Sequence, residues 1–275
     1  MRGTILILLF TLAFSLSGKG QIKYESNNGN YLTIRGTKLY YEEYGQGMPL
    51  LLLHGGLGNS ADFKKCLPHL SQKYKVIAFD APGLGRSEYA DSIMTYKGAA
   101  EYYSKAIDVL KLDSTYVIGW SDGGNAALLL AKMRPDKVKK IAVSGATYKL
   151  EGTTKEGLEA LKSFSDTTWV AKELKPWIKQ YKEKSPTGNW KKYITEAKNM
   201  WYEEIYFPKS VLLEINIPTL LIYGDNDMYT PELGLELHRA IKKSQFCILP
   251  NTSHDVFGEK PELISQIITD FFSTK

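Results

Sequence analysis

A short apolar run places the strongest constraint on the fold of this chain. The segment PLLLLHGG, residues 49–56, contains four consecutive leucines and ends in two glycines. A strand with one face in water alternates apolar and polar residues, whereas a strand buried on both faces is a continuous apolar run. We therefore expect a strand that other elements cover on both sides.

Similar runs alternate with helical patterns over most of the chain. The segment YLTIRGTKLYYEEYG is typical of two strands joined by a turn at Gly36 and Thr37. Further strands are expected in YKVIAF, STYVIGW, VKKIAVSGA, IPTLLIY and SQFCILPN, and helices at residues 61–71, 96–110, 122–133, 231–241 and 260–272. This alternation predicts an α/β fold with a mostly parallel, doubly wound sheet.

The alternation stops between residues 147 and 213. This segment is rich in lysine, glutamate and aromatic residues at helical spacing. Four of the five tryptophans of the chain lie in it: Trp169, Trp177, Trp190 and Trp201. We expect a helical cap, residues 147–213, inserted into a sheet domain made of residues 21–146 and 214–275. Its tryptophans either line an apolar pocket or pack the cap onto that domain.

The first twenty residues have the layout of a secretory signal peptide. Arg2 supplies a positive charge, residues 5–16 are almost entirely apolar, and small polar residues follow up to Gly20. The apolar run is shorter than the roughly 20 residues that a membrane-spanning helix needs. We expect cleavage before Gln21 and an exported protein, periplasmic or secreted, without a stable membrane span. An uncleaved membrane anchor is the alternative.

Charge and cysteine content exclude other classes of protein. The formal net charge of the 275 residues is +5 and no basic tract stands out, so nucleic acid is not an expected partner. Cys66 and Cys247 are the only cysteines. Two cysteines allow one pairing and no disulfide framework. We expect two buried, unpaired thiols.

The segment GWSDGG joins an expected strand to an expected helix. Gly119 to Gly123 fit the pattern G-x-S-x-G around Ser121. A serine that presents its hydroxyl above a sheet must lie on a very tight, strained turn. Side chains at the two glycines would collide there with neighbouring backbone. The helix that follows also directs its first N–H groups at any developing oxyanion. The position favours a nucleophilic serine over an incidental one.

A serine hydroxyl needs a general base, and the chain offers four histidines. Only His254 follows the last expected strand, in the loop PNTSHDVFGEKPE. His54 directly follows the leucine run and is better suited to hold a loop. His69 and His238 lie in helical patterns. His254 is therefore the candidate base.

The base in turn needs a carboxylate that fixes its tautomer and stabilises the imidazolium ion. The loop after TLLIYG offers Asp225 and Asp227. Asp227 is preferred because three positions after Gly224 leave room for the chain to turn before the carboxylate points inward. Asp225 is the alternative, and a hydrogen bond to the turn is its other expected role.

Five motifs in this order resemble the serine hydrolases of the α/β-hydrolase fold: LLLLHGGLGNS, FDAPGLGRS, GWSDGG, YGDND and NTSHDVFGEKPE. The resemblance covers residues 32–272. It implies Ser121 as nucleophile, Asp227 as acid and His254 as base. It also implies an acyl-enzyme reaction on a small-molecule substrate without metal or organic cofactor.

The resemblance further implies an oxyanion hole of backbone N–H groups. Asp122 supplies one of them, and Gly56 or Leu57 supplies the other. Trp120, next to the nucleophile, is expected to contact the substrate. Haloalkane dehalogenases and epoxide hydrolases of this fold carry aspartate in place of Ser121. Prolyl aminopeptidases carry H-G-G-P-G where this chain has leucine at position 57.

Two roles are open for Asp122, one structural and one in substrate binding. An acid in the first turn of a helix is favoured by roughly 0.3–1 kcal/mol through the helix dipole. A carboxylate beside the nucleophile would also attract an ammonium group. GWSDGG followed by IAVSGATY resembles the biphenyl hydrolase-like α-amino-acid ester hydrolases, in which the matching acid binds the substrate's amino group.

We expect the protein to be an exported serine hydrolase of small carboxylic esters. A narrower hypothesis is that its substrates are α-amino-acid esters. Aminopeptidases, C–C bond hydrolases, thioesterases and cofactor-free perhydrolases share the same triad and stay open. So does a receptor of low turnover that retains the triad.

Overall fold

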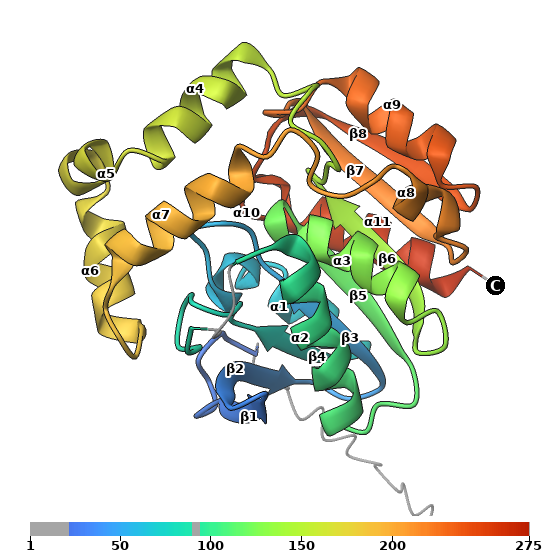
Figure 1. Cartoon of the computed structure of the whole chain (residues 1–275). Coiled ribbons are helices and arrows are strands. Elements are labelled where there is room, and N and C mark those ends of the chain that lie inside the picture. Colours follow the sequence, from blue (N-terminus) through green and yellow to red (C-terminus); the bar gives the residue numbers. More distant parts are fainter. Residues whose placement is uncertain (1–21, 90–93, 275) are drawn as a thin grey trace, which may run out of the picture.

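The computed structural model describes residues 22–89 and 94–274, and an eight-stranded sheet forms its centre (Figure 1). The predicted signal peptide, residues 1–20, lies outside the described residues. The strands are β1 (Asn30–Ile34), β2 (Thr37–Tyr44), β3 (Met48–Leu53), β4 (Tyr74–Phe79), β5 (Thr115–Trp120), β6 (Val138–Ser144), β7 (Thr219–Asn226) and β8 (Ser244–Ser253). Their order is β1-β2-β4-β3-β5-β6-β7-β8, and only the pairings of β2 are antiparallel. The predicted α/β fold with a mostly parallel sheet is confirmed.

Helices cover both faces of the sheet. On one face lie α2 (Tyr96–Val109), α3 (Asp122–Met133) and α9 (Pro231–Ala240); on the other lie the 3₁₀ helix η1 (Ser60–Phe63), α1 (Leu67–Leu70), α10 (Val256–Glu259) and α11 (Pro261–Ser273). The leucines of β3 alternate between the two cores. Leu51 and Leu53 pack on the first face, whereas Leu50 and Leu52 pack on the second. The run is continuously apolar because β3 is buried on both faces, as expected from the sequence.

One expected element is different in the structure. The single helix predicted at residues 61–71 is divided into η1 and α1. Pro68 lies in the first turn of α1, where the N–H that proline lacks would have no partner within the helix. A helix from residue 61 could not continue through this proline without losing a hydrogen bond.

Five helices connect β6 to β7. They are α4 (Lys155–Phe164), α5 (Thr167–Glu173), α6 (Lys175–Lys184), α7 (Trp190–Trp201) and α8 (Ser210–Glu214). Figure 1 shows α4 to α7 as a lobe beside the sheet, which we call the insertion helices. The short α8 instead contacts α3 and α9. The predicted boundaries of the cap and its role as a cap stay predictions.

The two cysteines form no disulfide. Cys66 is buried as expected, but Cys247 is only half-buried in β8. Within the described ranges, no helix combines the length and the apolar character that crossing a membrane requires.

Candidate active site

Ser121 lies at the junction of β5 and α3 in a strained backbone conformation. Its φ of 53° and ψ of −119° are rare for a residue with a side chain, and such strain costs about 1–3 kcal/mol. The neighbouring glycines make the turn sterically feasible. A Cβ atom on Gly119 would lie 2.4 Å from the Gly123 carbonyl oxygen, and one on Gly123 would lie 2.1 Å from that of Leu53. The Ser121 N–H donates to the Ser144 carbonyl at 2.8 Å.

The structure brings His254 and Asp227 together. His254 Nδ1 lies 2.7 Å from Asp227 Oδ1, and the Tyr229 N–H also donates to this oxygen. Asp227 is only 6% exposed. Because Nδ1 must carry a proton to donate to the carboxylate, the neutral ring keeps its lone pair on Nε2. His254 Nε2 is buried and has no hydrogen-bond partner among the described residues.

Asp225 takes the structural role that the sequence left as its alternative. Its two carboxylate oxygens accept the N–H groups of Thr252 and Asn251, at 3.0 and 2.9 Å. These hydrogen bonds lower the pKa of Asp225 below the ordinary value for aspartate. Asp225 therefore ties the end of β7 to β8, and Asp227 is the carboxylate that meets His254.

Gly145, which no sequence motif indicated, also lies at the candidate site. It follows β6 with a φ of +56°, and a Cβ atom there would lie 2.4 Å from His254 Cε1. Glycine at this position lets the imidazole lie directly against the backbone. Trp120 holds the same loop, since its indole N–H donates to the His254 carbonyl at 2.8 Å. Trp120 also lines the hollow above Ser121, where it was expected to contact substrate.

The candidate oxyanion donors are not equivalent. The N–H groups of Gly56 and Asp122 find no backbone acceptor within the part of the chain that the structure describes. The Leu57 N–H instead donates to the Tyr193 hydroxyl at 3.0 Å. Leu57 was the alternative to Gly56, and its N–H is already occupied by this hydrogen bond. Gly56 and Asp122 remain as the pair of candidate donors.

His54 orients the peptide that carries the Gly56 N–H. Its Nδ1 donates to the Gly55 carbonyl at 2.7 Å, and its Nε2 accepts the Ala81 N–H at 2.8 Å. Burial lowers the pKa of His54, which suits this neutral form. The C=O and N–H of a trans peptide point in opposite directions. With the Gly55 carbonyl bound to His54, the Gly56 N–H points to the other side.

The Asp122 carboxylate accepts a hydrogen bond on each oxygen. The Tyr96 hydroxyl donates to Oδ1 and the Trp201 indole donates to Oδ2, both at 2.9 Å. Burial raises the pKa of Asp122 above the ordinary value, and these two hydrogen bonds oppose part of the shift. The side chain thus joins α2 to α7 besides beginning α3.

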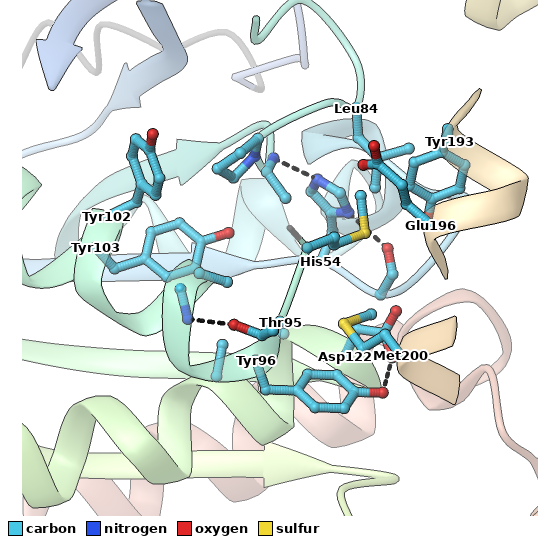
Figure 2. A pocket seen from close by; sticks show the side chains of 18 of the residues that line it. His54, Leu84, Thr95, Tyr96, Tyr102, Tyr103, Asp122, Tyr193, Glu196 and Met200 are labelled. Carbon is cyan, nitrogen blue, oxygen red and sulfur yellow. Dashed lines mark hydrogen bonds between the residues drawn. The ribbon is translucent and has the colours of Figure 1, made fainter. Parts of the chain in front are cut away.

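Two hollows meet at Asp122 and Gly55. The first, about 750 Å³ including space open to solvent, contains Ser121 and His254. The second, about 660 Å³, also has Asp122 in its lining (Figure 2). In Figure 2 it is bordered by tyrosines of α2 and by residues of α7, with the Tyr96 hydroxyl directed at Asp122. No lysine or arginine is among the described residues that line either hollow.

Residues suited to hold a metal do not gather here. In the described ranges, no group of three or more histidine, cysteine, aspartate or glutamate side chains could hold a metal ion. Catalysis without a cofactor stays a prediction from the resemblance.

Comparisons with known proteins support the α/β-hydrolase fold. A family model described as alpha/beta hydrolase fold matches residues 48–168. The uncharacterized hydrolase YugF of Bacillus subtilis (strain 168) is 29% identical over 261 residues, 87% of this chain and 96% of the relative. The human serine hydrolase BPHL is 25% identical over 264 residues, 87% of this chain and 84% of the relative. A meta-cleavage product hydrolase structure from Pseudomonas fluorescens IP01 matches with a TM-score of 0.73 at 22% identity, covering 89% and 97% of the two chains; this likeness concerns the fold.

Proposed function

We propose that this hydrolase, which belongs to the α/β-hydrolase family, is a serine hydrolase that cleaves small carboxylic esters through an acyl-enzyme. The observation that carries the proposal is the pairing of His254 Nδ1 with the buried Asp227. It leaves Nε2, in the hollow of Ser121, without a hydrogen-bond partner in the described part of the chain. The similarity to a serine hydrolase over most of both chains also supports it.

The reaction follows from the chemistry of these groups. Ser121 Oγ attacks the ester carbonyl carbon while His254 Nε2 takes the hydroxyl proton. Asp227 stabilises the imidazolium ion, and the N–H groups of Gly56 and Asp122 stabilise the oxyanion. The proton then passes to the leaving alkoxide as the tetrahedral intermediate collapses to the acyl-enzyme. Water, activated by the same histidine, releases the acid and restores Ser121.

The charges around the hollows favour neutral or cationic substrates. Asp122 lies at the boundary of the two hollows, and no lysine or arginine lines the described part of either. Two like charges at about 4 Å repel by about 4 kcal/mol at an effective dielectric constant near 20. A substrate that carries a carboxylate next to the scissile bond would meet this repulsion without a compensating cation. This supports simple or amino esters over dicarboxylate substrates.

The narrower proposal, that the substrates are α-amino-acid esters, can be tested at Asp122. An ammonium group near this carboxylate should make kcat/KM on the order of tenfold higher for an α-amino ester than for the same ester without the amine. Asp122→Asn removes the charge but keeps both hydrogen bonds, since its amide oxygen accepts from Trp201 and its NH₂ donates to the Tyr96 hydroxyl. We expect the amine preference to fall to about onefold, with neutral-ester turnover within a few fold of wild type.

The pH dependence supplies a second readout of the same variant. Because burial raises the pKa of Asp122, this carboxyl takes up its proton at higher pH than an ordinary aspartate. The amine preference of the wild type should therefore decline on acidification before free aspartate would titrate. Asp122→Asn should show no such decline. An unchanged amine-to-neutral ratio in the variant would leave Asp122 with its roles in the helix and the hydrogen bonds only.

Export is the remaining part of the proposed function. The mature protein is expected to begin at or near Gln21 and to be recovered from the periplasm or the medium. N-terminal sequencing or intact mass of natively expressed protein measures this. A protein that keeps Met1 and stays in the cytosol would contradict cleavage.

A further inference from the structure

The insertion helices hold the backbone of Leu57 from both sides. The Trp177 indole N–H, from α6, donates to the Leu57 carbonyl at 2.6 Å. The Leu57 N–H donates to the hydroxyl of Tyr193, from α7, at 3.0 Å. Leu57 has a φ of 60°, a left-handed conformation that residues other than glycine adopt at a cost. Both polar groups of its backbone are therefore committed to the insertion, in a conformation that needs external support.

Leu57 is the residue after Gly56, whose N–H is one candidate oxyanion donor. The sheet domain holds the peptide before Gly56, through His54 and through the Gly58 N–H, which donates to the Gly55 carbonyl. The peptide after Gly56 is held by Tyr193. The direction of the Gly56 N–H thus depends on both parts of the protein.

The other candidate donor is also in contact with the insertion. Trp201, at the end of α7, donates to Asp122 Oδ2 at 2.9 Å. Its ring packs on Gly56, since a Cβ atom on this glycine would lie 2.7 Å from Trp201 Cζ2. A single indole therefore touches both residues whose N–H groups would receive the oxyanion.

We propose that the insertion helices brace the oxyanion hole, with Trp177 and Tyr193 as positioning residues for the reaction. The inference rests on the proposed function, because it takes Gly56 and Asp122 as the oxyanion donors. Such donors stabilise a transition state only if they are held in place before the charge develops, and a site must be fixed to about 0.5 Å. Loss of the brace should therefore slow the chemical step more than it weakens substrate binding.

Tyr193→Phe removes one brace hydrogen bond with the least change of shape, and Tyr181→Phe is its matched control. The Tyr181 hydroxyl, from α6, is also buried and donates to a backbone carbonyl of the sheet domain, that of Gly83, at 2.7 Å. Like that of Tyr193, this hydroxyl forms a hydrogen bond to the backbone of the sheet domain, but it donates where Tyr193 accepts, and it does not reach the Gly56 loop. A purely structural role predicts equal effects of the two variants.

We expect Tyr193→Phe to lower kcat by about 5- to 30-fold, less than the loss of about 10²–10³ that follows removal of an oxyanion donor. KM should change by less than about twofold, and Tyr181→Phe should keep kcat within about twofold of wild type. Trp177→Phe, which removes the donor on the other side of Leu57, should resemble Tyr193→Phe. It keeps the proposal testable if Tyr193→Phe does not fold.

Inhibitor affinity separates bracing from general damage. A trifluoromethyl ketone forms a tetrahedral oxyanion adduct on the serine, whereas a carboxylic acid product binds without one. Tyr193→Phe should lower the affinity for the ketone by the same factor by which it lowers kcat. It should leave the inhibition constant of the product unchanged. Equal kcat and ketone affinity in Tyr193→Phe and Tyr181→Phe, in a protein that a fluorophosphonate labels at Ser121, would overturn the brace alone. Failure of that label on wild-type protein would overturn the proposed function together with it.

Discussion

Replacement of Ser121 by alanine is expected to lower kcat/KM for carboxylic esters by about 10⁴- to 10⁶-fold, because triad residues act as a unit and only binding and oxyanion stabilisation remain. His254→Ala should cost nearly as much. The backbone of Ser121 is strained whichever small side chain it carries, so the alanine variant is expected to fold. The measurement is multiple-turnover kinetics with p-nitrophenyl and amino-acid esters, accompanied by fluorophosphonate labelling.

His69→Ala is the matched control for the histidine. His69 lies in the short α1, on the face of the sheet opposite to α2 and α3, and lines neither hollow at Asp122. Its replacement should leave turnover within about twofold. Normal activity of Ser121→Ala would exclude the serine hydrolase. A wild-type protein that takes the label but releases product only once would instead indicate the low-turnover receptor.

Local sequence patterns predicted the fold because each pattern depends on the burial or backbone geometry of the strand, helix or turn in which it lies. The four leucines of β3 indicate burial on two faces, and the structure divides them between two cores. The glycines around Ser121 indicate a turn too tight for a Cβ atom, and the distances at Gly119 and Gly123 agree. Such signals need only the residue and its immediate neighbours.

The signals were weaker where the partner lies far along the chain. Trp177 is 120 residues from Leu57, and Tyr193 is 136 residues from it. The clustering of tryptophans indicated that the insertion packs on something, but nothing in the pattern names the partner. Gly145 was missed for the same reason, since its need for glycine comes from the distant His254 ring. Only the folded chain brings these pairs together.

The sequence pattern distinguishes Asp225 from Asp227 only weakly, whereas the structure gives them different hydrogen-bond partners. From the sequence, the two carboxylates differed only in how far the chain can turn after Gly224. In the structure, Asp225 accepts two backbone N–H groups of β8, whereas Asp227 receives His254 Nδ1. The structure thus places Asp227, the preferred residue, against His254, and the role of Asp227 in catalysis stays a prediction.

Asp227→Asn is expected to lower kcat by about 10⁴-fold, since the amide no longer holds the imidazole in the tautomer that leaves Nε2 as the base. Asp225→Asn is the matched control, with the same chemical change two residues away. Its activity should stay within a few fold of wild type, because its carboxylate binds the β8 backbone and not the histidine. A larger loss in Asp225→Asn than in Asp227→Asn would reverse the assignment of the acid.

Thermal stability should respond to Asp225→Asn even though activity does not. The N–H groups of Thr252 and Asn251 lower the pKa of Asp225 in the folded protein, so its charge stabilises the fold above the unfolded pKa of about 3.9. This contribution is lost as the pH falls through the lower, folded-state pKa. The Tm of Asp225→Asn should therefore lie below that of wild type at neutral pH, and the gap should close on acidification below about pH 4. A gap that is the same at neutral and acidic pH would mean that the carboxylate charge does not stabilise the connection between β7 and β8.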